Sequence, residues 1–195
     1  MATKRAPRAA DAKLGRFVAL LRGINVGGNN KLPMRDLVSL LEGLGLQNVK
    51  TYIQSGNIVF QSDQADPAQL SQTITGAIQQ GHGFAPYTLI LDSQALQAAM
   101  AANPFPEGEA EPKSLHLFFM DARPKAFDAG ALDRLKAPNE RYQLIDQVFY
   151  LHAPDGIGRS KLAENAGKGW GVNITARNWR TVSEVMAIAT GLAAP

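Results

Sequence analysis

The chain has 195 residues, of which 45% are hydrophobic, and this length and composition are enough for a packed core. The charged share of 19% excludes a disordered, highly charged protein. It contains no cysteine, which excludes disulfides, thiolate zinc sites, iron–sulfur clusters and cysteine nucleophiles. The formal net charge of +3 arises within the first 13 residues, which contain four basic side chains (Lys4, Arg5, Arg8 and Lys13) and one acidic side chain (Asp11). The other basic and acidic residues, out of 20 and 17 in all, are equal in number and cancel.

Residues 1–15 are expected to form a basic extension in front of the fold. A solubilising extension is the favoured interpretation, and contact with nucleic acid is the alternative. The extension has no apolar core of signal-peptide length, and no run approaches the ~18 apolar residues that a membrane span needs. We therefore expect a cytoplasmic protein that does not interact with membranes.

The first half of the chain predicts the order strand, helix, strand, strand, helix, strand, and then a short helix. The apolar residues 16–22 predict a buried strand, and residues 23–31, rich in Gly and Asn, predict a loop. Pro33 is suited to open a helix, and Gly45 is suited to end it. The remaining elements are a hairpin of strands 49–54 and 57–61, a helix at 67–81, a strand at 87–91 and a helix capped by Asp92.

Residues 103–113 (NPFPEGEAEPK) contain three prolines and three glutamates, which is typical of a linker. After this linker the order of elements repeats. The expected elements are a strand at 115–120, a helix around 127–135, strands 141–145 and 148–152, a helix at 160–167, a strand at 172–175 and a final helix at 182–189.

The repeated order is typical of the ferredoxin-like arrangement, so we predict an α+β protein with two ferredoxin-like subdomains, each a small mixed or antiparallel sheet with helices packed on it. The expected organisation is an extension at 1–15, a first subdomain at 16–102, a linker at 103–113 and a second subdomain at 114–195. The halves share no residue-level repeat. Two separate domains and one continuous unit are therefore both open interpretations.

In this arrangement the loop after the first strand and the turn after the second strand lie at the same edge of the sheet. Consecutive glycines before a helix let main-chain N–H groups approach an anion closely. A tight loop that requires positive φ is the alternative interpretation. The candidate ligand-binding residues of this edge are Arg22, Asn25, Gly27, Gly28, Gln54, Ser55 and Asn57.

The same topology places residues 153–159 and 176–179 at one edge of the second half. Arg159 and Lys161 stand at the predicted start of a helix, where cations are unfavourable unless an anion is bound; a solvated charged turn is the alternative. Arg177 and Trp179 are suited to bind a phosphate and stack on a ring, whereas helix capping by Asn178 and core packing of Trp179 are the alternatives. The candidate residues here are Ser160, Lys161, Arg177, Asn178 and Trp179.

No catalytic, cofactor or metal signature is complete in this sequence. Residues 158–162 (GRSKL) begin like a nucleophile elbow, but Leu162 stands where the second glycine is needed. Residues 23–28 and 156–161 match neither the dinucleotide-binding nor the phosphate-loop pattern. The three histidines lack metal-ligand spacing. We expect neither a cofactor nor a metal ion.

Four of these segments carry a family resemblance. They are residues 22–28 (RGINVGG), 52–57 (YIQSGN), 156–162 (GIGRSKL) and 175–181 (TARNWRT). In this order they resemble the signature segments of the bacterial family called domain of unknown function 1697. The resemblance spans residues 17–192. It implies two ferredoxin-like α+β subdomains, as the order of elements does, and it implies no activity, because the family's function is not established.

The leading hypothesis is a protein that binds a small anionic ligand, phosphorylated or nucleotide-like, at these loops. An enzyme acting on a phosphorylated substrate through Ser160 or Lys161 is one alternative, although the sequence shows no general base beside either residue. An RNA- or DNA-binding module is the other alternative, because the ferredoxin-like pattern can host one. The neutral charge balance outside residues 1–13 weakens that alternative.

Overall fold

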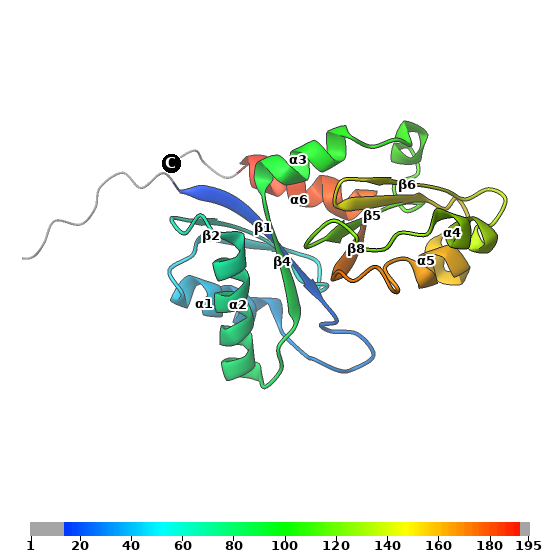
Figure 1. Cartoon of the computed structure of the whole chain (residues 1–195). Helices are drawn as coiled ribbons and strands as arrows, with labels where there is room; N and C mark the ends of the chain where they lie inside the picture. The colour runs from blue at the N-terminus through cyan, green and yellow to red at the C-terminus, as the bar shows by residue number, and fades with distance from the viewer. Residues whose placement is uncertain (1–13, 192–195) are drawn as a thin grey trace, which may run out of the picture.

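The computed structural model describes residues 14–191, which form two four-stranded antiparallel sheets covered by helices (Figure 1). Residues 1–13, most of the expected basic extension, lie outside the described part. The first half comprises β1 (Gly15–Arg22), α1 (Met34–Gly43), β2 (Gln47–Tyr52), β3 (Asn57–Ser62), α2 (Pro67–His82), β4 (Tyr87–Asp92) and α3 (Ser93–Ala101). The second half comprises η1 (Pro106–Glu109), β5 (Leu115–Met120), α4 (Ala129–Leu135), β6 (Arg141–Ile145), β7 (Val148–His152), η2 (Ile157–Arg159), α5 (Lys161–Asn165), β8 (Ile174–Asn178) and α6 (Trp179–Gly191).

The strand orders confirm the predicted fold class. They are β2-β3-β1-β4 in the first sheet and β6-β7-β5-β8 in the second, which is the ferredoxin-like order in both halves. Each half then continues into one more helix, α3 after β4 and α6 after β8. None of the helices formed by residues 14–191 is both long and apolar enough to cross a membrane.

The helices are divided between the outer faces of the two sheets and the space between them. In the first half, α1 and α2 cover one face of the sheet, where Leu37, Leu41 and Ile74 pack against Ile58 and Phe60. In the second half, α4 and α5 cover the corresponding face, where Leu132 and Leu162 join the cluster around Phe149. The two remaining helices, α3 and α6, lie side by side at the centre of the molecule (Figure 1).

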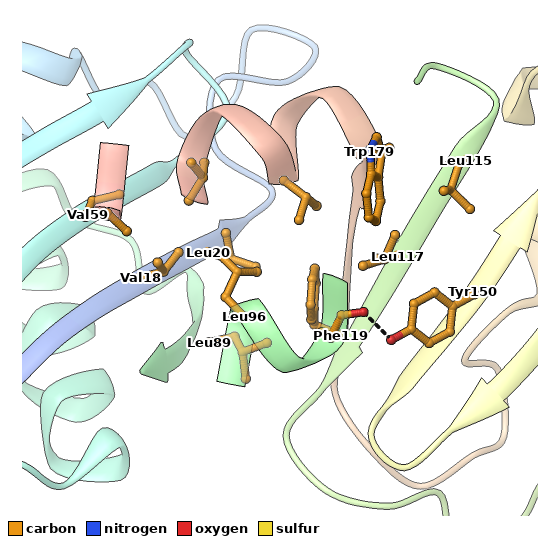
Figure 2. Close-up of a cluster of buried hydrophobic side chains, with 14 of the residues drawn as sticks. Val18, Leu20, Val59, Leu89, Leu96, Leu115, Leu117, Phe119, Tyr150 and Trp179 are labelled. Atoms are coloured by element: carbon orange, nitrogen blue, oxygen red, sulfur yellow. Dashed lines mark hydrogen bonds between the residues drawn. The ribbon is translucent and has the colours of Figure 1, made fainter. Parts of the chain in front are cut away.

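The inner faces of both sheets contribute to one buried cluster around α3 and α6 (Figure 2). Val18 and Val59 come from the first sheet, Leu117 from the second, and Trp179 from α6. Tyr150 crosses from β7 and donates a 2.7 Å hydrogen bond to the carbonyl oxygen of Ala99 in α3. Both halves therefore bury apolar area in the same cluster.

Several element boundaries differ from the sequence prediction. The helix α2 passes Gly81 and ends at His82, and Gly83 caps it with a φ of 80°, which provides the left-handed stop. The strand β8 begins and ends later than expected, so that Arg177 and Asn178 lie in a strand, and α6 begins at Trp179. The turn between β2 and β3 includes Ile53, which has a positive φ of 48° and therefore ends β2 early.

The connecting segment 103–113 is partly ordered against the second half. It contains the short helix η1, and Phe105 is buried in the shared cluster. Phe105 also stacks on His152 of β7, with ring centroids 6.1 Å apart. The main-chain N–H of Arg180 donates to the carbonyl oxygen of Pro112, which ties the end of the segment to the start of α6.

Candidate functional site

The candidate residues fall into two groups at opposite ends of β8. At the start of β8, the carbonyl oxygen of Ile174 accepts a 2.9 Å hydrogen bond from the Arg22 guanidinium at the end of β1. At its far end, Asn178 pairs with His116, which also neighbours the end of β7. Four residues of extended chain separate the two ends by roughly 13 Å. We call residues 22–31 and 53–57 the first edge, and residues 153–161 the second edge.

The loop of the first edge is held by the side chain of Asn25. Its amide donates to the carbonyl oxygens of Leu32 (2.9 Å) and Gln54 (2.8 Å), and its oxygen accepts from the N–H of Leu32 (2.8 Å). Gly27 and Gly28 form the exposed tip of a small hairpin, both with positive φ. The asparagine therefore joins the loop to the β2–β3 turn, as the topology predicted, and it has no amide hydrogen left for a ligand.

Arg177 reaches from β8 into the first edge, although the sequence placed it at the second edge. Its guanidinium donates to the carbonyl oxygens of Leu21 (2.7 Å) and Ser55 (3.2 Å), and to the side-chain oxygen of Asn57. It also bonds within its own strand, to the hydroxyl of Thr175 and the carbonyl of Ala176. Five acceptors on three strands and a turn thus surround one side chain, and this arrangement fastens the second sheet to the first.

The charge of Arg177 has no anionic partner within ion-pair distance among residues 14–191. All five acceptors are uncharged oxygens, and burial lowers the pKa of the guanidinium to about 10, so that it stays protonated at neutral pH. Asn57 is fully buried, and its amide donates to Tyr52 and Ser55. Asn25, Asn57 and Arg177 thus use their side-chain donors within the protein and make the first edge a structural junction, whereas Arg22 of this edge is exposed and donates to the carbonyl oxygen of Ile174.

Besides Arg177, three more of the five second-half candidates serve the fold. The Ser160 hydroxyl accepts a 2.9 Å hydrogen bond from the N–H of Ala163 and caps α5. The Asn178 side chain accepts from the N–H of Thr181 (2.9 Å) and caps α6. Trp179 is 8% exposed in the shared cluster (Figure 2). Capping and packing were the alternatives that the sequence left open for Asn178 and Trp179.

Two cations of the second edge stand free beside a groove of about 760 Å³. Arg159 and Lys161 are exposed and line it, and neither forms an ion pair with any described residue. The groove also contains two carboxylates, but each already accepts a hydrogen bond: Glu140 from the N–H of Ala137, and Asp155 from the Asn139 amide. None of these four charged groups forms an ion pair with a described residue, and the two cations also lack a side-chain hydrogen bond to any described residue.

A second hollow, of about 520 Å³, adjoins this groove and shares Asp155 and Gly156 with it. His152 lines it, and its Nδ1 lies 3.1 Å from a guanidinium nitrogen of Arg141, which also pairs with Glu107. Because a guanidinium only donates, Nδ1 accepts, and the neutral ring carries its proton on Nε2. Burial, helped by Arg141, lowers the pKa of His152 and keeps it neutral near pH 7.

The sequence analysis did not include several residues that shape these sites. Glu140 and Asp155 lie in loops, and no motif marks them. Gly56, which the sequence indicates as the glycine of the hairpin turn but not as a candidate site residue, lies against Leu21 and Ile24 with positive φ. Among residues 14–191, no three histidine or acidic side chains gather in a way that could hold a metal ion.

Comparison with known proteins agrees with the fold. Residues 14–150, more than half of the chain, match the family model described as protein of unknown function (DUF1697), and the chain belongs to that family. The match ends before residues 156–162 and 175–181, which had contributed to the resemblance. A similar solved structure is that of the conserved bacterial protein SP0830 from Streptococcus pneumoniae, with a TM-score of 0.65 and 23% identity over 90% of this chain and 99% of the other. Among proteins of curated function, none matches the chain.

Proposed function

We propose that this member of the family binds a small anionic molecule, phosphorylated or nucleotide-like, in the groove of the second edge. One observation carries the proposal: Arg159 and Lys161 are exposed on the wall of a groove of about 760 Å³, and no described carboxylate pairs with either. Cations that are left unpaired at a concave surface favour an anionic ligand, because a phosphate accepts charge-assisted hydrogen bonds from both.

The surroundings of these cations support a ligand larger than a free phosphate. The main chain at Gly158 is open, since a side chain there would meet no atom within 4 Å. The adjoining hollow at His152 continues the groove through Asp155 and Gly156. A phosphate at Arg159 and Lys161 would leave room for a nucleoside or sugar toward His152. The absence of cysteine is consistent with action in a reducing compartment such as the cytoplasm.

The alternative of an enzyme that uses Ser160 is less well supported. The Ser160 hydroxyl is buried and caps α5, and no described histidine or carboxylate is hydrogen-bonded to it. A serine nucleophile needs such a base within hydrogen-bond reach. The nucleic-acid alternative is tested in the same experiment as the main proposal, because its affinity should fall steeply with salt.

The test is a thermal-shift screen of the full chain against nucleotides, sugar phosphates, pyrophosphate and a short oligonucleotide at low and high salt. A ligand at ~100 times its Kd adds ~2.7 kcal/mol to the free energy of unfolding, which should raise the Tm by about 5–10 °C. Arg159→Ala or Lys161→Ala should weaken binding by about 1–3 kcal/mol, since each removes a charge-assisted hydrogen bond.

The matched control is Lys50→Ala, which removes an exposed lysine from β2, outside the groove. It should leave the ligand-induced shift unchanged. An anionic hit whose affinity is the same in the Arg159 and Lys161 variants as in the parent protein would refute the proposed site. A hit confined to the oligonucleotide and lost at high salt would favour the nucleic-acid alternative.

A further inference from the structure

A third hollow, of about 380 Å³, lies between α3 and the β6–β7 hairpin. The two halves of the chain meet here, and no lining residue belongs to the first or second edge. Its volume is within the ~300–1,000 Å³ typical of small-molecule sites, which occur preferentially between domains. The proposed anion site neither includes nor requires it.

The walls of this hollow are apolar, and their side chains are exposed or only half-buried. On one side α3 presents the small side chains of Ala95, Ala98 and Ala102, all of them exposed. On the other side Ile145 and Val148 are half-buried and pack against the shared cluster. The alanines leave the space that larger side chains would fill, so a ligand here would cover apolar surface from both halves.

The side chains at the floor of the hollow have no free hydrogen-bond donor to offer an anionic ligand. Phe119 and Tyr150 line it, and each is only 1% exposed. The Tyr150 hydroxyl is already used, because it donates to the carbonyl oxygen of Ala99 (Figure 2). This bond satisfies one of the last carbonyl groups of α3, which no helical N–H can reach. An anion buried at this floor would therefore find no side-chain donor, and a buried charge of either sign would find no opposite charge there.

The rim is polar, but its charges cancel. Arg123 and Asp146 form an ion pair at the mouth of the hollow, with side chains 75% and 71% exposed. No other charged residue lines the hollow, and the neighbouring Gln147 adds an uncharged amide. A ligand head at the rim thus meets one positive charge, one negative charge and an amide. This rim favours neither an anionic nor a cationic head group.

We infer that the hollow between α3 and the β6–β7 hairpin is a second ligand site, which takes an uncharged, mainly apolar small molecule with one hydroxyl or carbonyl group. The apolar part of the ligand lies between the α3 alanines and Val148, and its polar group lies at the rim beside Gln147. Burial of apolar area supplies the binding free energy, and the neutral rim excludes charged heads because ions lose hydration without gaining a partner.

The test compares ligands with one tail and three heads: 1-octanol, octanoate and octylammonium. Each is titrated into the 15N-labelled full chain, and the amide shifts of α3 and of residues 145–148 are followed by NMR. 1-Octanol should bind most tightly, with its shifts confined to these segments. Shortening the alcohol to 1-hexanol should weaken binding by up to about fourfold per methylene, the equivalent of ~0.8 kcal/mol for each buried CH₂ group.

Two sets of variants locate the ligand. Ala98→Leu and Ala95→Leu fill the hollow and should abolish binding of 1-octanol, whereas Ala101→Leu, at an exposed α3 position outside the lining, should not affect it. Asp146→Asn leaves Arg123 unpaired and should improve octanoate binding about twofold to fivefold. Asparagine also tolerates the left-handed backbone of position 146, where φ is 51°. Arg123→Gln should improve octylammonium binding by a similar factor.

Three outcomes would overturn the inference. One is tighter binding of octanoate or octylammonium than of 1-octanol by the parent protein, which would mean that the site takes charged heads. The second is unchanged 1-octanol affinity in a folded Ala98→Leu or Ala95→Leu variant, which would place the ligand elsewhere. The third is the absence of any saturable shift in α3 and residues 145–148 up to the solubility limit of the alcohol. None of these results bears on the proposed anion site.

Discussion

The first and second edges use similar residues in different ways. Both are loops at strand ends, rich in Gly and containing Arg and Ser, and both were candidate anion sites by sequence. At the first edge, Arg177 donates to five neutral oxygens and Asn25 makes three hydrogen bonds within the loop. At the second edge, Arg159 and Lys161 meet no described carboxylate. The polar composition of a loop therefore does not by itself distinguish a structural junction from a candidate ligand site, whereas the hydrogen-bonding capacity that its side chains leave unused separates these two edges.

The largest expected effect comes from removing the junction at the first edge. Arg177→Ala leaves the carbonyl oxygens of Leu21 and Ser55 and the side chain of Asn57 without their donor, and should lower the free energy of unfolding by about 3–5 kcal/mol. Urea unfolding measures this. Arg180→Ala, at an exposed position of α6, is the control and should change stability by less than about 0.5 kcal/mol. A fully stable Arg177→Ala protein would refute the view that the first edge is a structural junction.

Gly56→Ala should destabilise by about 2–4 kcal/mol at the same edge. Gly56 has a φ of 75°, and an added Cβ would lie 2.7 Å from the Cβ of Leu21 and 2.9 Å from the Cδ1 of Ile24. The matched control is Gly76→Ala inside α2, where the added methyl meets no atom within 4 Å. That control should stabilise by ~0.5–1 kcal/mol, because alanine is the better helix former. Similar Tm values for the two variants would contradict the close packing described for the turn.

Acid should act on the second half beside the second edge, because His116 in β5 and His152 at the end of β7 lie next to it, whereas the first edge contains no histidine. Burial lowers the pKa of His116 below its ordinary 6.5, and its Nδ1 has no hydrogen-bond partner. Between the lowered pKa and 6.5 the unfolded chain binds more protons, so stability rises with pH across that window and levels off above it. The Tm should therefore be lower at pH 5.5 than at pH 7.5. In His116→Leu this difference should shrink, and an unchanged difference would exclude His116 as its source.

The smallest effect is expected at the free cations. Arg159→Ala and Lys161→Ala should each change the ligand-free stability by less than about 0.5 kcal/mol, because neither side chain has an ion-pair partner among the described residues. Urea unfolding of both variants beside Arg177→Ala makes the comparison direct. A loss above about 1.5 kcal/mol in either variant would show that these cations support the fold, and would remove the contrast between the edges.

Local signals in the sequence predicted most elements, and long-range contacts account for the rest. Asp92 caps α3 as expected, and the Asp146–Gln147 turn joins β6 to β7 with the predicted boundaries, because both depend on adjacent residues. Gly81 and Gly83 are equally good stops by sequence, and only the structure shows which one adopts positive φ. The first-half partners of Arg177 lie 120 to 156 residues away, so no local pattern could predict that its side chain belongs to the first edge.

The position of α6 has a consequence for how the protein is made. This C-terminal helix covers part of the inner face of the first sheet, in contact with β1, β2 and β3. On the ribosome, those three strands emerge more than a hundred residues before the helix that shields them. Until α6 is made, the nascent chain therefore lacks the cover for that part of the apolar sheet face, although α3 already follows β4 and packs on the same face. A chain cut short before Trp179 would leave the part that α6 covers exposed.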